Sequence, residues 1–279
     1  MPRSGRIKNG VLRYKKKMKK IFLITVIVLV SFLVYFGLDV ADIENGLNPI
    51  ENGRSDNNFK GELAIIIDDL GYSSSLDEKL LRIDESLTVA ILPFLDNTQT
   101  AVNNFSGRDN FEIILHMPME PIDEVHSEEF MLFTDQTKEE TKSLFSDGLD
   151  QMEGRAIGVN NHKGSKFTSD RESMGVFLEL VKERDLFFVD SYTINTSVGY
   201  DLAKELSIPT ARRDVFLDYV DGKEEIREKL YEAVDLALEN GSAIAIGHHK
   251  ENTLQVLEEE LSNLEKKGVK LVKVSDLLE

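Results

Sequence analysis

The sequence predicts an α/β fold in which seven or eight parallel strands alternate with helices and curl into a barrel. Short apolar runs rich in β-branched residues recur along the chain, and most are followed by a segment with helical spacing of apolar residues. The first run and four later ones end in polar residues suited to catalysis. Because the carboxyl ends of all strands meet at one mouth of a barrel, these endings favour a barrel over an open doubly wound sheet.

The N-terminal residues differ in composition from the rest and are expected to tie the domain to a membrane. Residues 1–20 hold nine Lys and Arg and no acid, and residues 21–38 are an apolar run without charge. A membrane-spanning helix needs roughly 17–25 residues, and flanking cations stay on the cytoplasmic side. The sequence therefore predicts a basic cytoplasmic tail, one transmembrane helix over 21–38, a polar linker over 39–60 and an extracytoplasmic domain over 61–279. A cleavable signal peptide is the alternative, but no small-x-small site follows Leu38, so an uncleaved anchor in the cell membrane is favoured.

Charge and cysteine content limit the kinds of partner and site. The chain has 50 acidic and 33 basic residues and a net charge of −17. This balance argues against nucleic acid as a partner and weakly disfavours strongly anionic polymers. The absence of cysteine excludes disulfides, a thiolate zinc site and lipid attachment through a cysteine.

The first predicted strand, Ala64–Ile67, carries the most informative ending. Its four apolar residues, three of them β-branched, predict a strand buried on both faces. Asp68 and Asp69 follow at once, and Gly71 permits a sharp turn. Because successive strand residues point to opposite sides, the two carboxylates can serve different tasks. A turn with two solvated acids is an equally good interpretation of this stretch alone.

The remaining elements alternate in the same manner. Helices are predicted over 73–83, 97–105, 135–152, 169–182, 197–206, 224–239 and 253–267. Strands are predicted over 87–92, 111–115, 156–159, 186–189, 243–246 and 269–274, with a short extended segment before Arg213. The helix from 169 opens with a capping-box pattern, Ser169 to Glu172, and the helix from 224 is amphipathic and ends at Gly241.

Polar residues that follow the predicted strands could form one site. They are Asp68, Asp69, His116, Glu120, Asn161, His162, Asp190, Arg213, Asp214 and His248. Any one of these histidines alone is more often a structural residue bonded to the backbone. Three histidines together with a carboxylate pair predict a divalent-metal site able to activate water. His126 stands in a polar loop and is expected to be a surface residue.

Six motifs, in order, carry a resemblance to a known family. They are Ile67-Asp68-Asp69-Leu70-Gly71, Leu115-His116-Met117-Pro118-Met119-Glu120-Pro121, Asn161-His162-Lys163-Gly164-Ser165, Phe188-Val189-Asp190-Ser191, Asp214-Val215-Phe216-Leu217-Asp218 and Ala245-Ile246-Gly247-His248. Together they resemble the divergent polysaccharide deacetylases, distant relatives of the nodulation-type chitin and peptidoglycan deacetylases, over residues 62–279. The resemblance implies a deformed (β/α)7–8 barrel that hydrolyses acetamide groups with a divalent metal, expected to be Zn²⁺.

The same resemblance implies the acid and base of the reaction. By position, Asp68 is the general base that accepts the proton of the attacking water. His248 is the acid that protonates the leaving amine, and Asp190 is expected to keep this histidine oriented and charged. Arg213 is expected to pair with Asp190 or Asp68, although a structural ion-pair network is an equal alternative for Arg213, Asp214 and Asp218.

The metal ligands implied by the resemblance include one departure from the family's pattern. Asp69 and His116 take the first two ligand positions. The better-studied relatives place a second histidine four residues after the first, and here that position holds Glu120. The third ligand is then His162 or Glu120. His162 is preferred because imidazole suits zinc and Pro118 can turn Glu120 away.

The sequence thus predicts a membrane-anchored, metal-dependent deacetylase whose partner is an N-acetylated cell-surface glycan. The alternative is a barrel that has lost catalysis and binds a glycan or another envelope component, which the changed His-x-x-x-His spacing favours. A different metal hydrolase, such as a phosphoesterase, is the third hypothesis. It is disfavoured because its anionic substrate would approach a strongly acidic protein.

Overall fold

The computed structural model of the protein describes residues 59–123 and 130–279. The predicted tail, anchor and linker up to residue 58 lie outside these ranges, as does His126. Among the described residues no helix is both long enough and apolar enough to cross a membrane.

The described strands form one parallel sheet, and β1 pairs with three of the other strands. The strands are β1 (Gly61–Leu70), β2 (Leu87–Ile91), β3 (Phe111–Met119), β4 (Ala156–Lys163), β5 (Phe187–Asp190), β6 (Thr210–Arg212), β7 (Val215–Phe216), β8 (Ser242–His248) and β9 (Val269–Val272). Their order is β6-β5-β4-β3-β2-β1-β8-β7. The long strand β1 pairs with β8 along one edge, and along the other it pairs first with β9 and then with β2.

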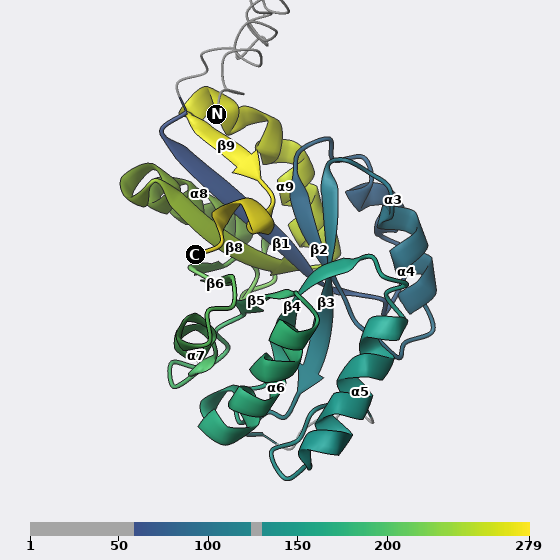
Figure 1. Ribbon diagram of the computed structural model, residues 1–279. Coiled ribbons are helices and arrows are strands. Elements are labelled where there is room, and N and C mark those ends of the chain that lie inside the picture. Colours follow the sequence, from purple (N-terminus) through teal and green to yellow (C-terminus); the bar gives the residue numbers. More distant parts are fainter. Residues whose placement is uncertain (1–58, 124–129) are drawn as a thin grey trace, which may run out of the picture. The chain divides into compact units, whose positions relative to one another are not determined.

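Helices surround these strands (Figure 1). They are α3 (Asp77–Leu80), α4 (Thr98–Phe105), α5 (Lys138–Asp150), α6 (Arg171–Glu183), α7 (Gly199–Glu205), α8 (Lys223–Asn240) and α9 (Glu251–Glu260). Each of them follows a strand, so the predicted alternation of strand and helix is confirmed. Short 3₁₀ turns replace the end of the last predicted helix, and the helix predicted over 73–83 is reduced to the single turn of α3.

The predicted barrel is present only as a curled sheet whose hydrogen bonding is interrupted. Within the described chain the sheet has nine strands rather than seven or eight, and it ends at β6 and β7. Only Arg213 and Asp214 separate these two end strands. The Arg213 N–H donates to Asp190 O (3.1 Å) and the Asp214 N–H to Ile244 O (2.9 Å), so these residues join the two ends.

Side chains of β1 alternate between two apolar layers. Leu63, Ile65 and Ile67 are fully buried and pack in the same cluster as apolar residues of α6, α8 and α9. Ala64 and Ile66 belong to a second cluster built mainly from other strands. Burial on both faces was predicted for this strand and is confirmed, and Asp68 continues the series of the second layer.

The N-terminus of α6 differs from the predicted capping box. The helix begins at Arg171 and its N-cap is Asp170, whose side chain accepts the N–H of Ser173 (2.8 Å). Ser169 lies in the preceding 3₁₀ turn, so Ser169 and Glu172 do not form the expected pair. An aspartate is as good an N-cap as a serine, and the helix therefore starts later than the pattern indicated.

Candidate active site

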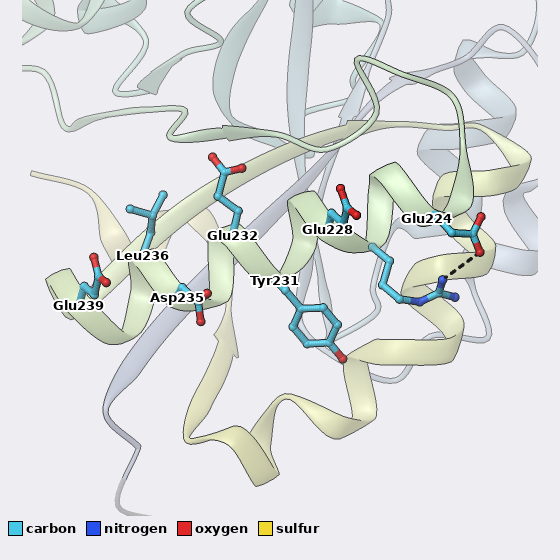
Figure 2. Close-up of a pocket in the computed structure, with 8 residues that line it drawn as sticks. Glu224, Glu228, Tyr231, Glu232, Asp235, Leu236 and Glu239 are labelled. Carbon is cyan, nitrogen blue, oxygen red and sulfur yellow. Dashed lines mark ion pairs between the residues drawn. The ribbon is translucent and has the colours of Figure 1, made fainter.

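A cavity of about 510 Å³ lies where β1, β3, β4, β5 and β8 end. It is lined by Asp68, Asp69, His116, Asn161, His162, Lys163, Ser191, Thr193, Arg213, Phe216, Tyr219, Ile246 and His248. A second hollow of about 610 Å³ runs along α8 and is lined mainly by acidic side chains (Figure 2). None of the sequence-predicted site residues lines that second hollow.

The two adjacent aspartates reach the same cavity because the backbone of β1 is irregular at its end. Its register shifts between Ile67 and Leu70, and Asp69 has a left-handed backbone (φ 67°). Simple alternation would send Asp69 toward the helices, away from Asp68. Instead both carboxylates approach His116 Nε2, Asp68 Oδ2 at 3.6 Å and Asp69 Oδ1 at 3.3 Å. The sequence argument that Asp68 and Asp69 point to opposite sides of the strand is therefore wrong. A strained turn at the end of β1 brings the two side chains into the same cavity.

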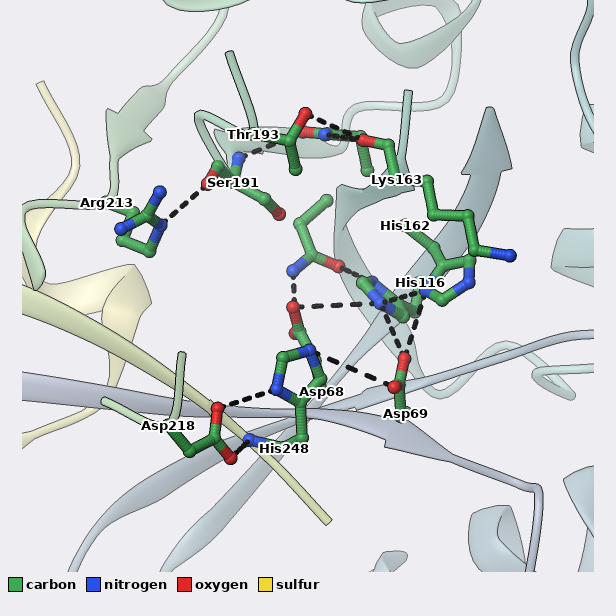
Figure 3. A network of polar contacts seen from close by, with 12 residues as sticks. Asp68, Asp69, His116, His162, Lys163, Ser191, Thr193, Arg213, Asp218 and His248 are labelled. Carbon is green, nitrogen blue, oxygen red and sulfur yellow. Dashed lines mark hydrogen bonds and ion pairs between the residues drawn. The ribbon is translucent and has the colours of Figure 1, made fainter. Parts of the chain in front are cut away.

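Three side chains converge on one point, as a metal site requires (Figure 3). Asp69 Oδ1 lies 3.0 Å from His162 Nδ1 and 3.3 Å from His116 Nε2, and these two nitrogens are 3.1 Å apart. Ligand bonds of roughly 2.0–2.2 Å in a tetrahedron place donor atoms about 3.3–3.6 Å apart. The observed spacings are close to that value. Asp69 Oδ1 is buried and has no hydrogen-bond partner among the described residues, so it fits a metal ligand.

Asn160 fixes both the tautomer of His116 and the position of Asp68. Its Nδ2 donates to Asp68 Oδ1 (2.9 Å), because a carboxylate can only accept, and its Oδ1 then accepts from His116 Nδ1 (2.7 Å). His116 Nε2 is left unprotonated and directed at the other donors, as a metal ligand must be. Sequence reasoning missed Asn160 and selected Asn161. The strand β4 continues to Lys163, beyond the predicted end at Val159, and alternation with His162 along this extension was the available signal for Asn160.

The two aspartates differ in their affinity for a proton. Burial alone would raise the pKa of Asp69, but its contacts with His116 and His162 hold that pKa well below the ordinary value. Burial raises the pKa of Asp68, and the nearby His116, His248 and Asn160 oppose the rise only in part. Asp69 is thus suited to stay ionised as a ligand, and Asp68 to take up a proton.

His248 is held by Asp218, not by Asp190. Its Nδ1 donates to Asp218 Oδ1 (2.7 Å), while Asp218 Oδ2 accepts the backbone N–H of His248 (2.8 Å) and the hydroxyl of Thr253 (2.7 Å). Burial alone would lower the pKa of His248, but Asp218 and the more distant Asp69 and Asp68 raise it above the ordinary value. The imidazole Nε2 faces the cavity, 3.9 Å from Asp69 Oδ2.

Asp190 has a different function from the one expected. It accepts the N–H of Tyr192 (2.8 Å), the hydroxyl of Ser197 (2.7 Å) and the N–H of Tyr200 (3.1 Å). These bonds fix the loop between β5 and α7. The prediction that Asp190 orients His248 is corrected, since its two carboxylate oxygens are already bonded within its own loop.

Arg213 also departs from its expected pairing. Its Nε donates to Ser191 O (2.7 Å) and its Nη2 to Tyr192 O (2.8 Å), and its guanidinium lies 5.0 Å from the centre of the Phe216 ring. Among the described residues it forms no ion pair, so the expected pair with Asp190 or Asp68 is not found. Burial lowers the pKa of Arg213, and neighbouring carboxylates oppose this shift without touching it.

Glu120 and Asp214 lie outside the cluster of three converging side chains. Glu120 accepts the backbone N–H (2.9 Å) and hydroxyl (2.8 Å) of Thr134 and pairs with Lys166 (2.6 Å). Asp214 accepts the N–H of Ile244 (2.8 Å). Of the two alternatives for a third ligand, the structure therefore brings His162, and not Glu120, to Asp69 and His116.

Comparison with known proteins gives relatives that are similar in sequence and solved structures that are similar in fold. The chain is 32% identical over 218 residues to the uncharacterised protein YibQ of Escherichia coli K12, covering 78% of this chain and 67% of that one. The uncharacterised protein ATU2773 of Agrobacterium tumefaciens C58 has a similar crystal structure (TM-score 0.71, 22% identity, 78% of this chain and 89% of that one). A mutant of BA3943, described as a CE4 family pseudoenzyme, matches less closely (TM-score 0.50, 13% identity, 78% and 67%).

A family model agrees with these similarities and covers the described domain. The model for divergent polysaccharide deacetylases matches residues 65–278, from the middle of β1 to the last 3₁₀ turn and almost the end of the chain. The matched span contains the two aspartates and the three histidines of the cavity. The chain belongs to the divergent polysaccharide deacetylase family.

Proposed function

We propose that this protein is a metal-dependent hydrolase that removes N-acetyl groups from a polysaccharide. The observation that carries the proposal is the convergence of Asp69, His116 and His162 in one cavity, beside a second carboxylate and the imidazole of His248. The membership of the deacetylase family supports the same reaction class. Two adjacent carboxylates whose pKa values are shifted in opposite directions are typical of catalytic sites.

Asp69, His116 and His162 would hold the metal. Two imidazoles and one carboxylate match the ligand set of catalytic zinc sites, so Zn²⁺ is the proposed ion. The ion would supply Lewis-acid chemistry, which lowers the pKa of water and polarises a carbonyl. Asn160 would keep His116 in the required tautomer.

The chain's own groups account for the proton transfers of amide hydrolysis. Asp68 accepts a proton from the attacking water as the oxygen of that water bonds to the acetyl carbon. His248, held by Asp218, gives a proton to the amide nitrogen as the carbon–nitrogen bond breaks. The products are acetate and a free amine on the sugar. The raised pKa values of Asp68 and His248 suit these two transfers.

The location follows from the sequence and is part of the proposal. We place the domain on the outer side of the cell membrane, held by residues 21–38, where a cell-surface glycan would be the substrate. Protease added to intact cells stripped of their wall should digest the domain. Protection of the domain, or a mature N-terminus beyond Leu38, would contradict an uncleaved outward-facing anchor.

A glycan-binding protein without activity is the second candidate function. The observation that favours it is the loss of the second histidine of His-x-x-x-His, whose position is taken by a glutamate bonded elsewhere. Similarity in fold to a CE4 family pseudoenzyme is compatible with this candidate. The two candidates differ in one measurable product, acetate.

The test combines metal content with acetate release on one preparation. The purified protein should contain about one equivalent of zinc and release acetate from chito-oligosaccharides or peptidoglycan. Removal of the metal by a chelator should stop release, and added zinc should restore it. A protein that binds no divalent metal at micromolar concentration would refute the hydrolase, and metal binding without acetate from any N-acetylated glycan would favour the second candidate.

A further inference from the structure

Arg213 is a half-buried cation in the wall of the active-site cavity that lacks a carboxylate partner. Two of its five N–H groups donate to Ser191 O and Tyr192 O, and in the described chain the other three make no hydrogen bond. Taking a charge partly out of water without pairing it costs stability. A cation kept in that state beside a catalytic centre is available to a ligand.

The guanidinium is held rigidly in this position. Tyr192 has a left-handed backbone (φ 48°), and this turn lets two successive carbonyls point at the same guanidinium, which an extended chain would not allow. The Phe216 ring also lies against the guanidinium, with its centre 5.0 Å from the guanidinium carbon. A cation held by these contacts loses little entropy when it binds an anion.

A second unsatisfied group lies next to Arg213. The hydroxyl of Ser191 is buried and has no hydrogen-bond partner among the described residues, although Ser191 itself is only 5% exposed and lines the cavity. In Figure 3 the Ser191 side chain points toward the centre of the network. Buried hydroxyl groups are rarely left without a partner, so this one indicates a polar group supplied by a ligand.

The nearby carboxylates of the chain are engaged elsewhere. Asp190 accepts three hydrogen bonds within its own loop, and Asp214 accepts the N–H of Ile244. Asp68 is bonded to Asn160. Although the chain has a net charge of −17, none of these acids neutralises Arg213 by direct contact. Net charge alone therefore does not describe the local charge of this cavity.

We propose that Arg213 and Ser191 form a subsite for a carboxylate carried by the glycan, either on the acetylated sugar or on the adjoining sugar. The planar guanidinium and the hydroxyl match the planar, singly charged carboxylate. This inference rests on the proposed function of the same cavity and narrows its substrate to acidic N-acetylated glycans. It also explains why Arg213 does not pair with Asp190 or Asp68.

Binding of matched sugars tests the subsite without requiring turnover. Calorimetry on the full chain in detergent compares N-acetylmuramic acid with N-acetylglucosamine, which differ by one carboxylate-bearing ether. It also compares a disaccharide of glucuronic acid and N-acetylglucosamine with di-N-acetylchitobiose. In at least one pair the acidic sugar should bind about tenfold or more tightly, as expected for a charge-assisted hydrogen bond. The pair that shows the preference identifies which sugar carries the carboxylate.

Variants assign that preference to the two residues. Arg213→Gln should abolish it, and Ser191→Ala, which leaves the bonds of Arg213 to the backbone intact, should reduce it. Arg212→Gln is the matched control, because Arg212 carries the same charge but lies outside the cavity, against Tyr192 and Tyr200. The control should keep the full preference, and unchanged melting temperatures exclude unfolding.

The outcomes separate this inference from the proposed function. Equal affinity within both pairs, a preference that survives Arg213→Gln, or no binding of any of the four sugars would overturn the subsite. Acetate release without a preference for acidic sugars would leave the deacetylase standing and the subsite refuted. A preference that depends on Arg213 in a chain that releases no acetate would support the subsite and refute the deacetylase.

Discussion

Asp68 and Asp69 are neighbours whose surroundings give them opposite proton affinities. Asp68 continues the inward series of β1 and is 3% exposed, so burial raises its pKa. Asp69 is turned by its left-handed backbone toward two imidazoles, which lower its pKa. At the residue scale, a single strained φ angle separates a proposed base from a proposed ligand.

Replacing each aspartate should therefore have a different effect. Asp68→Asn should keep bound zinc and lose acetate release by ~10²–10⁴-fold, the usual contribution of a general base. Asp69→Asn should lose most of the metal. Asp96→Asn, an exposed carboxylate after β2, is the control and should change neither property. Metal analysis and acetate assays on the same preparations check this, and full activity of Asp68→Asn would disprove its role as base.

The partner of His248 makes a prediction about pH. As an acid, His248 must be protonated, so activity falls as pH rises through its pKa, which Asp218 raises above the ordinary value of about 6.5. Asp218→Asn removes the negative charge and should move the alkaline limb of the kcat profile to lower pH. Asp190→Asn should leave that limb in place, because Asp190 does not contact His248. If the alkaline limb moved with Asp190→Asn and not with Asp218→Asn, Asp190 would be the residue that orients His248, as the sequence analysis expected.

These residues show what the sequence could and could not predict at this scale. Asp69, His116 and His162 stand within three residues of the ends of predicted strands, and strand ends of a parallel barrel share one mouth, so their convergence was predictable. That Asp218, and not Asp190, binds His248 was not predictable. This contact depends on β7 pairing with β8, and a strand of two residues cannot be recognised in a sequence.

At the scale of elements, β1 is held by close contacts on both its edges and faces. It pairs with β2, β8 and β9, and its first residue lies directly against α8. The strand was predictable from its apolar run, but its extension to Gly61 was not, because that start depends on a helix far along the chain. The glycine is required by this approach and not by a turn.

Gly61→Ala tests the contact between β1 and α8. An added Cβ would lie 2.3 Å from Ala237 O, a backbone atom that cannot move without displacing the helix. We expect a loss of about 1–3 kcal/mol in stability, as for other overpacking changes. Gly175→Ala in α6 is the control, since its nearest neighbour is 3.9 Å away, and it should be neutral or slightly stabilising. Urea unfolding measures both, and an unaffected Gly61→Ala would show that β1 and α8 are less tightly packed.

At the scale of the whole described domain, the two end strands of the sheet are joined by backbone hydrogen bonds of the two residues between them. Strands β6 and β7 end the hydrogen-bonded order, while the cavity gathers residues from both halves of the sheet. The parallel α/β class was predictable from the alternation of elements. The break in strand pairing between β6 and β7 was not predictable. It results from the shortness of these two strands, which only tertiary hydrogen bonds define.

Metal binding should consequently stabilise the molecule as a whole. Asp69, His116 and His162 come from β1, β3 and β4, so one ion would connect three strands and bind the buried Asp69 Oδ1, which has no hydrogen bond among the described residues. A ligand at a hundred times its Kd adds about 2.7 kcal/mol, which is roughly 5–10 °C in Tm for a domain of this size.

The measurement is the Tm of the chelated protein before and after addition of zinc. His162→Ala should abolish the rise, whereas Glu120→Gln should keep it, because Glu120 is bonded to Thr134 and Lys166. Glu120→Gln also lowers the starting Tm slightly through the loss of its ion pair, so the rise and not the absolute value is compared. If Glu120→Gln abolished the rise and His162→Ala preserved it, the third ligand would be the glutamate, and the geometry would have to change when the metal binds.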